Sequence, residues 1–537
     1  MMNFSVAFSS NVANLVCWSP DGRYLAVPDN NKLYIKDSLT ASNLFTSYVC
    51  YDFIKLLQWS PDSSMILTGT PSSSSTATAE CPCVEVWSIN NPDWRCRIQL
   101  GSAGLLTASW APDSRHVLTT DLFHLRITIW SLVNKSVACI KNPKDCGQGL
   151  QFSSDGCYLA ALERIDCKDH LTILEAKSWQ LVKQFPLSTS DAAGLAWGCG
   201  GDAGTATIIA VWDSILAYNL TLYAMCGRVL SSVCGAESYG HGVRGAAWSP
   251  TGKHLVIGGH DTKLRVMSYM TWDITSERAH SPIIEGKTGS NSSQNTTSSS
   301  TGNRFISTNN GENITKAAMP VEEDRVRVFK EVTKALVPPS AAALASGTGG
   351  VNVQLVTRET AYEEELCRPV HLAMSCTPTP FTSPGITACL NVVSGGFRGA
   401  GHGIVNIIEN GAVSGGVTAM LFSHDGRYLA TRVQQLPTVV WVWSVPKLSL
   451  LAVLVHSNSV RDLSWSPRHA RLAVCTGEET LFLWTAFGSL TVVTPVPLRM
   501  LPTAVRWHPS GRRLLLIGRG GGQFCVCSVG STERYKQ

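Results

Sequence analysis

Short stretches in which polar and apolar residues alternate recur along the chain, and each ends near a tryptophan. The clearest are residues 84–88, 127–131, 440–444 and 481–485. Alternation at period two, with β-branched and aromatic residues, predicts strands. The sequence therefore predicts an all-β protein.

A second pattern recurs in register with these strands. It consists of an aromatic residue, a Ser-Pro-Asp-Gly-like turn and an aliphatic run, as in residues 18–26. Nine copies begin at positions 18, 59, 110, 152, 197, 248, 422, 465 and 507. Apart from one jump of 174 residues, they are 41 to 51 residues apart. This spacing is typical of four-stranded propeller blades of the WD40 type.

One such blade cannot bury its apolar faces alone and must close into a ring with its neighbours. Two complete seven-bladed rings would need roughly 590 residues, and the chain has 537. We therefore predict a single WD40-type β-propeller of about nine four-stranded units. Seven or eight units stay open, because propellers usually have about four to eight blades. Residues 3–8 are expected to complete the last blade, so that no ring edge is exposed.

The long gap between copies divides the chain. Units one to six are assigned to residues 1–275, an irregular low-complexity insertion to 276–415, units seven to nine to 416–530, and a tail to 531–537. Within the insertion, residues 286–318 are rich in Ser, Thr, Asn and Gly, which predicts a disordered loop. Residues 326–332 and 351–356 alternate like strands and are expected to form an irregular blade edge or to pack on the ring. Residues 71–82 predict a mobile hairpin loop.

Composition excludes several classes of partner. The net charge of +5 is mild and the basic residues are dispersed, so no nucleic-acid partner is expected. The N-terminus lacks the basic start of a secretory signal, and the longest apolar stretch is interrupted by Pro446 and Lys447, so no membrane association is expected. The eighteen cysteines contain no CxxC pair. Cysteines such as Cys139, Cys475 and Cys525 are interpreted as buried free thiols of a reducing compartment.

No motif indicates catalysis. Residues 286–288 and 395–403 are glycine-rich but lack the strand-to-helix context of a phosphate-binding loop. His116, His254 and His508 lie in or beside the repeated turn, where a structural role is expected. The sequence predicts neither an enzyme nor a cofactor or metal site.

The hydrogen-bonded tetrad of typical WD40 blades is incomplete. Gly240-His241 and Asp261 suggest one set in the sixth unit, but Met267 stands at its third-strand Trp position. His456 and Asp462 suggest a partial set in the eighth unit. We expect apolar packing to hold most blades together.

Loops between the second and third strands share a ring face with the connections between blades. Residues 101–104, 121–126 and 164–170 are therefore expected to converge there. Aromatic and arginine side chains are frequent interface anchors. The candidate protein-docking residues are Phe123, His124, Arg126, Asp166, Lys168 and Asp169. The alternative interpretation is a set of solvated hairpin tips with local ion pairs.

Several stretches outside the generic repeat resemble one family, the centrosomal and spindle-pole WD-repeat proteins usually called WD-repeat protein eight, or WD40 repeat-containing protein antisense to the p53 gene. The segments are 101–105, 123–132, 135–137, 166–169, 178–181, 210–213, 440–443 and 471–477. The resemblance covers most of 1–275 and 417–527. The insertion and residues 71–82 depart from it.

The resemblance implies a non-enzymatic scaffold in the cytoplasm and cytoskeleton, at the centrosome, spindle pole or basal body. It implies binding to a coiled-coil microtubule-anchoring protein and an indirect link to a minus-end-directed kinesin. Its implied roles are microtubule anchoring, spindle organisation and ciliary assembly. The alternative is a generic WD40 adaptor, such as a ubiquitin-ligase substrate receptor or an RNP component, because function depends on surface sites and not on the propeller fold.

Overall fold

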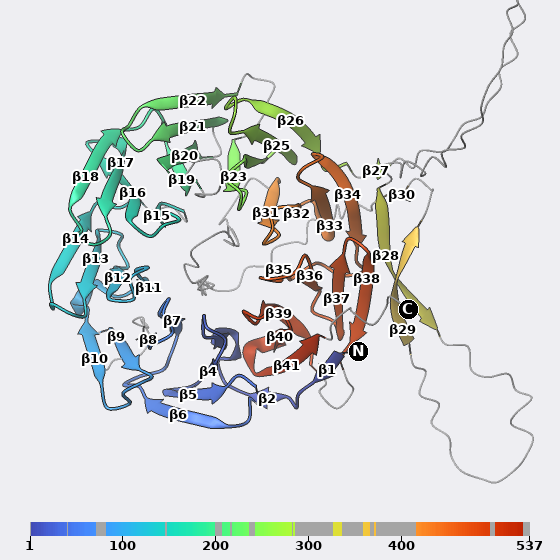
Figure 1. Ribbon diagram of the computed structural model, residues 1–537, viewed down its shortest axis with the longest axis horizontal. Helices are drawn as coiled ribbons and strands as arrows, with labels where there is room; N and C mark the ends of the chain where they lie inside the picture. The colour runs from blue at the N-terminus through green and yellow to red at the C-terminus, as the bar shows by residue number, and fades with distance from the viewer. Residues whose placement is uncertain are drawn as a thin grey trace, which may run out of the picture.

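The computed structural model is a closed ring of β-sheets set radially around a central axis (Figure 1). The structure describes residues 2–39, 41–70, 82–144, 148–198, 207–214, 217–235, 242–281, 283–284, 326–335, 358–365, 370–371, 415–494 and 500–529. Nine sheets of this described part make up the ring, so the chain is a nine-bladed β-propeller. The prediction of one all-β ring of about nine units is confirmed, and seven or eight blades are excluded.

Within each blade the strands follow one another from the centre of the ring to its rim (Figure 1). Blade one contains β3 (Cys17–Trp18), β4 (Tyr24–Asp29), β5 (Lys32–Asp37) and β6 (Leu44–Val49). Blade two contains β7 (Leu56–Trp59), β8 (Met65–Thr70), β9 (Cys83–Ser88) and β10 (Arg95–Gln99). Blade three contains β11 (Thr107–Trp110), β12 (His116–Thr120), β13 (Arg126–Ser131) and β14 (Val137–Lys141). Blade four contains β15 (Leu150–Phe152), β16 (Tyr158–Ile165), β17 (Lys168–Glu175) and β18 (Leu181–Pro186).

The remaining blades repeat this order. Blade five contains β19 (Ala192–Trp197), β20 (Ile208–Asp213), β21 (Asn219–Ala224) and β22 (Val229–Cys234). Blade six contains β23 (Val243–Trp248), β24 (His254–Gly259), β25 (Lys263–Ser268) and β26 (Ile274–Ala279). Blade seven contains β31 (Val417–Phe422), β32 (Tyr428–Val433), β33 (Leu436–Ser444) and β34 (Ser449–Val455). Blade eight contains β35 (Asp462–Trp465), β36 (Leu472–Cys475), β37 (Thr480–Thr485) and β38 (Gly488–Val493), and blade nine β39 (Pro502–Trp507), β40 (Arg513–Gly518) and β41 (Gln523–Val529). The described residues also include the short 3-10 turns η1 (Ala13–Leu15), η2 (Gly101–Ala103) and η7 (Arg519–Gly521).

The ring closes through the N-terminus. Strand β1 (Met2–Phe4) pairs with the outer side of β41, and β2 (Phe8–Ser9) pairs with the same strand further along. The Phe8 and Phe524 rings stack with centroids 5.4 Å apart. The prediction that residues 3–8 complete the last blade is confirmed, and the rim of β41 is covered.

Apolar packing between blades forms the core. Nine clusters of buried side chains lie between neighbouring blades, one at each contact around the ring. The repeated aromatic position adds a polar link at several of these contacts. Indole Nε1 of Trp110, for example, donates to the Gln58 carbonyl of the preceding inner strand at 3.2 Å, and that of Trp507 donates to the Ser464 carbonyl at 3.0 Å. In these units the tryptophan therefore links its blade to the blade before it.

The Ser-x-Asp turn between the first two strands is a local hydrogen-bonded unit. In blade one Ser19 Oγ donates to Asp21 Oδ1 at 2.6 Å, and the same oxygen accepts from the Arg23 amide at 3.0 Å. The Asp21 amide donates to Ser63 Oγ of the next turn at 3.0 Å. These side chains satisfy backbone groups that the turn removes from the sheet.

Part of the insertion extends blade seven. Strand β28 (Arg327–Ala335) pairs in parallel with β34, and β29 (Arg358–Glu365) pairs with β28. Two further short strands, β27 (Ile283–Ile284) and β30 (Val370–His371), pair with each other. Residues 326–332 thus form the predicted irregular blade edge. Their observed partner is β29, whereas the predicted strand at 351–356 lies outside the described residues.

Other predictions about the insertions fall on residues that the structure does not describe. They include the loop at 286–318, most of 71–82, the glycine-rich segments 286–288 and 395–403, and Gly240-His241. The boundary expected at residue 275 falls inside β26, which continues to Ala279. Blade six therefore extends slightly beyond its predicted end.

Three members of a tetrad-like set, a tryptophan, a threonine and a histidine, are bonded at a different place from the one expected. Trp443 Nε1 donates to Thr431 Oγ1 at 2.8 Å, and Thr431 Oγ1 also lies 2.8 Å from Nε2 of His280. Met267 occupies the tryptophan position of blade six as predicted, and it is buried. Of the partial set expected in blade eight, the Asp462 carboxylate accepts from the Val505 amide of blade nine at 2.9 Å, and His456 Nδ1 lies 3.0 Å from the Thr438 carbonyl.

The cysteine prediction is partly corrected. Among the described residues every cysteine is free, and Cys475 and Cys525 are buried as expected. Cys139 is exposed, because it lies on β14 at the rim, where alternate side chains face solvent.

Candidate protein-docking face

The β12–β13 hairpin tip presents an apolar surface on a stiff turn. Asp121 is buried, and its Oδ1 accepts from the Leu125 amide at 2.8 Å. This bond closes the loop around Phe123 and His124. Phe123 is 68% exposed and Leu125 61% exposed. Arg126 begins the following strand and is also exposed.

The connection between blades two and three packs beside this tip. The Leu122 amide donates to the Ala103 carbonyl at 3.2 Å. Gly104 has φ +75°, and a Cβ at this position would lie 2.3 Å from Leu122 Cδ1, so the close approach requires glycine. A hollow of about 260 Å³ opens between the two segments, and Arg126 and Trp130 are among its lining residues.

The β16–β17 tip follows on the next blade. Asp166 and Cys167 both have positive φ, which fits a two-residue hairpin loop of type I′. The side chains of Asp166 and Lys168 are exposed. Asn142 connects this tip with the previous one: its amide donates to the Leu125 carbonyl at 3.0 Å, and its carbonyl accepts from the Arg164 amide at 3.1 Å. The predicted convergence of the three segments is therefore confirmed.

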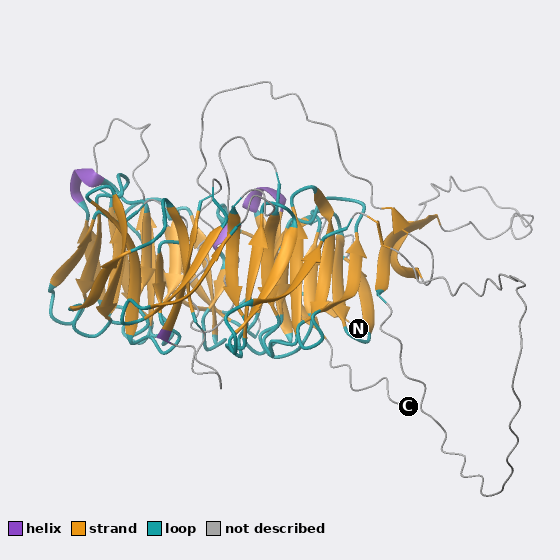
Figure 2. Ribbon diagram, turned by 90° about the horizontal axis from the view of Figure 1, so that it is seen from above, coloured by secondary structure: helices purple, strands orange, loops and turns teal. Residues whose placement is uncertain are grey.

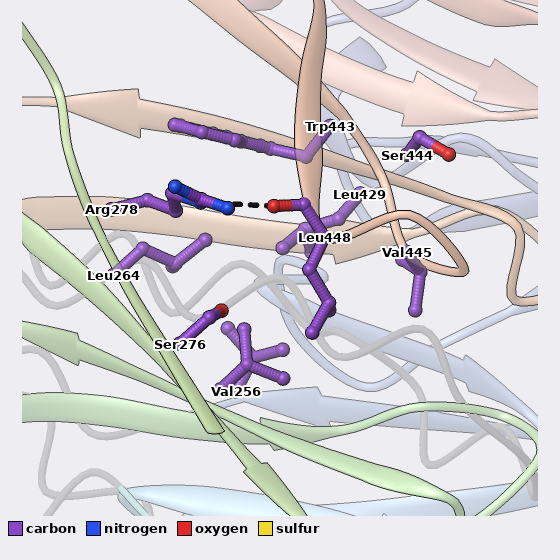
Figure 3. A pocket seen from close by; sticks show the side chains of 10 residues that line it. Val256, Leu264, Ser276, Arg278, Leu429, Trp443, Ser444, Val445 and Leu448 are labelled. Carbon is purple, nitrogen blue, oxygen red and sulfur yellow. Dashed lines mark hydrogen bonds between the residues drawn. The ribbon is translucent and has the colours of Figure 1, made fainter. Parts of the chain in front are cut away.

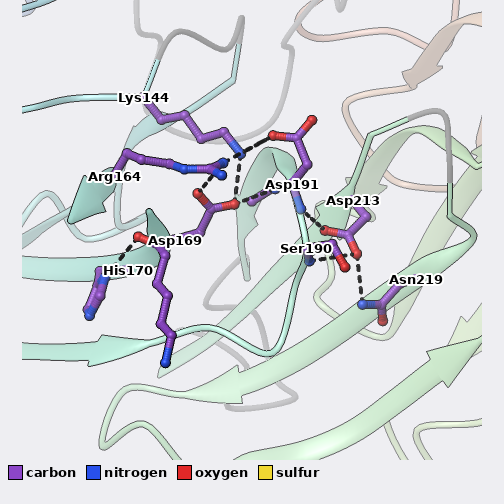
Figure 4. A network of polar contacts seen from close by, with 10 residues as sticks. Lys144, Arg164, Asp169, His170, Ser190, Asp191, Asp213 and Asn219 are labelled. Carbon is purple, nitrogen blue, oxygen red and sulfur yellow. Dashed lines mark hydrogen bonds and ion pairs between the residues drawn. The ribbon is translucent and has the colours of Figure 1, made fainter. Parts of the chain in front are cut away.

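Asp169 lies inside the protein and not on this surface. It is 2% exposed, and its carboxylate accepts from Lys144 Nζ at 2.7 Å, Arg164 Nη1 at 3.1 Å and the Ala192 amide at 2.7 Å. Figure 4 shows these groups converging on the carboxylate between blades four and five. Asp169 thus holds the β16–β17 hairpin in place from inside the protein, and its carboxylate is not available to a partner at the surface.

Asp191 extends the same network toward solvent. Its Oδ1 lies 2.8 Å from Lys144 Nζ and 3.4 Å from Arg164 Nη1 (Figure 4). The hydrogen bond from Lys144 lowers the pKa of the Asp191 carboxyl, with a further contribution from the charge of Arg164. Asp213 accepts from the Asp191 amide at 3.2 Å and links the network to blade five.

Sequence reasoning found the surface residues but missed their support. Phe123, His124, Arg126, Asp166 and Lys168 lie along one face, as predicted. Lys144 and Asp191 were not anticipated. Each lies in a connection between blades, at a distance along the sequence from Asp169 that the repeat pattern does not fix. No local sequence pattern therefore indicated that they would contact Asp169.

A second hollow is too small for a ligand. It lies between blades six and seven, where Arg278 Nε donates to the Leu448 carbonyl at 2.9 Å (Figure 3). Its volume of about 20 Å³ holds roughly one water molecule. Among the described residues no group of three or more His, Cys, Asp or Glu side chains is arranged to hold a metal ion.

Comparison with known proteins agrees with this architecture. The family model described as WD domain, G-beta repeat matches residues 232–268 and 448–485. The WD repeat-containing protein WRAP73 of Mus musculus is 34% identical over 534 residues, which covers 99% of this chain and 97% of that protein. The chain belongs to the WRAP73 family. The family resemblance inferred from the sequence is confirmed.

Other similarities within and beyond the WD repeats are weaker than the match to WRAP73. An uncharacterized WD repeat-containing protein of Schizosaccharomyces pombe is 25% identical and covers 52% of this chain and 57% of its own length. The crystallised C-terminal WD40 domain of Sif2 aligns over 99% of both chains with 10% identity and a TM-score of 0.44. The nine blades are those of the sheets in the chain itself. No helix in its described residues is long and apolar enough to cross a membrane.

Proposed function

We propose that this WRAP73-family protein is a non-enzymatic scaffold at the centrosome, spindle pole or basal body. It binds a coiled-coil microtubule-anchoring protein through the docking face on blades three and four. Through that partner it is linked indirectly to a minus-end-directed kinesin, and it contributes to microtubule anchoring, spindle organisation and ciliary assembly. Membership of the WRAP73 family supports the scaffold role, and the cellular site rests on the family resemblance.

The observation that carries the docking proposal is the exposure of Phe123 on a rigid tip. An isolated flexible loop would lose conformational entropy when it binds. Here hydrogen bonds of Asp121 fix the first hairpin tip and those of Asp169 fix the second. Most of the conformational entropy is therefore lost during folding and not on binding. The mixture of Phe123, Leu125 and Arg126 has the composition of an interface centre.

Charge-reversing variants test this proposal in cells. The tagged protein and the variant Arg126→Glu/Lys168→Glu would be compared for position relative to the microtubule-organising centre and for co-purifying proteins. Both side chains are exposed, so the variant is expected to fold. If the variant loses both its spindle-pole or basal-body foci and a co-purifying coiled-coil partner, the result would support the proposal that this face binds the partner.

A matched control lies on the other face of the ring. Arg115 is an exposed arginine in the first turn of blade three, and Arg115→Glu makes the same charge change away from the docking face. This variant is expected to keep its partner. Unchanged recovery by Arg126→Glu/Lys168→Glu would exclude the face, and diffuse localisation with ligase subunits or RNA would favour the generic adaptor.

A further inference from the structure

The turns between the first two strands form the ring face opposite the docking face, and they differ in charge. A carboxylate occupies the third turn position in blades one, two, three, four and seven: Asp21, Asp62, Asp113, Asp155 and Asp425. Blade six has Thr251 at this position, blade eight has Arg468 and blade nine has Ser510. Blades eight and nine are therefore adjacent blades whose turns both lack this negative charge.

The replacement in blade eight leaves a buried hydroxyl without its usual acceptor. Ser466 corresponds to Ser19, whose hydroxyl donates to Asp21. Ser466 is fully buried, and its Oγ has no hydrogen-bond partner. An unsatisfied buried polar group lowers stability. Local rules are broken in this way most often at functional sites.

Positive charge accumulates where the carboxylates are missing. Arg468 and His469 are exposed on blade eight, and Arg512 is exposed on blade nine. Arg468 Nε donates to the Pro509 carbonyl at 3.1 Å, which connects the two turns. In the described part of the chain no carboxylate pairs with Arg468 or Arg512.

The flanking blades differ in this respect. Arg427 of blade seven lies 3.8 Å from Asp425, and Arg23 of blade one lies 3.6 Å from Asp21. Blades eight and nine thus carry exposed positive charge on adjacent turns that both lack the carboxylate. We call Arg468, His469 and Arg512 the basic turn patch.

An aromatic side chain lies on the same face of blade eight. Phe487 occupies the two-residue turn between β37 and β38 and is 97% exposed. Arginine together with an exposed aromatic residue is typical of protein interfaces. A nucleic-acid site would instead need a longer basic stripe.

We infer that the basic turn patch is a second docking site, which binds an acidic protein segment carrying an apolar residue. The segment's carboxylates take the place that the turn aspartates occupy in other blades, and Phe487 contacts the apolar residue. The site lies on the opposite face from Phe123 and Lys168. The scaffold can therefore hold two proteins at once.

The variant Arg468→Asp gives a test that does not depend on damaging the fold. It removes the positive charge and restores the carboxylate that Ser466 lacks. A short fluorescein-labelled peptide of Glu and Asp around one Leu would be titrated by fluorescence anisotropy, beside its Gln and Asn counterpart. We expect the full-length protein to bind the acidic peptide selectively, and Arg468→Asp or Arg512→Glu to weaken that binding about tenfold.

Two controls make the result specific. Arg115→Glu changes an exposed arginine in the equivalent turn of blade three and is expected to bind as the unaltered protein does. Arg126→Glu/Lys168→Glu should also bind the peptide normally, which separates this site from the docking face. The inference is overturned if the peptide does not bind or if Arg468→Asp binds equally well. It is also overturned if phosphatidylserine vesicles or duplex DNA bind more tightly than the peptide and are lost with the same variants.

Discussion

The imidazole Nε2 of His280 lies 2.8 Å from the Thr431 hydroxyl, although 151 residues separate the two in the chain. Nδ1 of His280 faces the Thr262 carbonyl, which can only accept, so Nδ1 carries the proton. The Thr431 hydroxyl therefore donates to Nε2 and accepts from Trp443 Nε1. This chain of bonds joins blade six to blade seven across the insertion.

Removing the central hydroxyl should weaken that junction. Thr431→Val keeps the side-chain shape but leaves His280 Nε2 and Trp443 Nε1 buried without this partner. We expect the free energy of unfolding to fall by about 2 to 3 kcal/mol, measured by urea unfolding with tryptophan fluorescence. A change below about 0.5 kcal/mol would mean that the bond chain does not stabilise the junction.

Blade eight offers the reciprocal substitution as a control. Val474 occupies the position that corresponds to Thr431, opposite the residue two before the third-strand tryptophan. Trp484 Nε1 is buried there without a hydrogen-bond partner. Val474→Thr should supply the missing acceptor and raise the free energy of unfolding by about 1 kcal/mol.

Stability should depend on pH through two buried histidines. Burial lowers the pKa of His280 and of His456 to about 4, below the value near 6.5 expected in the unfolded chain. Between these values the unfolded state binds more protons, so stability is complete above about pH 6.5 and is lost as the pH falls toward 4. Each histidine should cost roughly 2 kcal/mol at pH 5 relative to pH 7.5.

The pH dependence can be assigned by substitution. His456→Gln and His280→Gln should each flatten the curve of unfolding free energy against pH between 5 and 7.5 by a similar amount. Curves that keep the slope of the unaltered protein would assign the acid sensitivity to other groups.

The buried carboxylate beneath the docking face should be essential for folding. Asp169→Ala leaves Lys144 and Arg164 close together with only the partly exposed Asp191 as a counter-charge, and leaves the Ala192 amide without its acceptor. We expect a loss of about 3 to 5 kcal/mol in the free energy of unfolding, measured by urea titration. Asp166→Ala, at the exposed tip of the same hairpin, should change it by less than about 0.5 kcal/mol. Equal effects would argue against a structural role for Asp169.

The turn of blade eight should become more stable when its carboxylate is restored. In Arg468→Asp the new side chain can accept from Ser466 Oγ and from the amide two residues further on, as Asp62 does for Ser60 and Ser64. We expect a gain of about 1 kcal/mol. Amide hydrogen exchange of residues 466–472 should slow accordingly, and unchanged exchange would show that Ser466 is not a source of instability.

The sequence by itself determined the repeat and the strand pattern and indicated about nine units, and the structure excluded the alternatives of seven or eight blades. These are local properties, since alternation at period two and a turn of fixed chemistry are visible in each copy. Even the closing role of residues 3–8 followed from the sequence, because a ring with an incomplete last blade needs a partner strand. The exposed residues Phe123, Arg126 and Lys168 were found for the same reason: their hairpin positions place them at loop tips.

Only the tertiary structure decided which groups meet between blades. Asp169 looks like its exposed neighbours in the sequence, but Lys144 and the Ala192 amide approach it from separate connections and enclose it. The tryptophan–threonine–histidine set formed around His280, because blade seven supplies Thr431 and Trp443 and the connection from blade six supplies the histidine. Such contacts depend on how neighbouring blades pack against each other. The local sequence around a residue does not indicate which residue of the next blade it will contact.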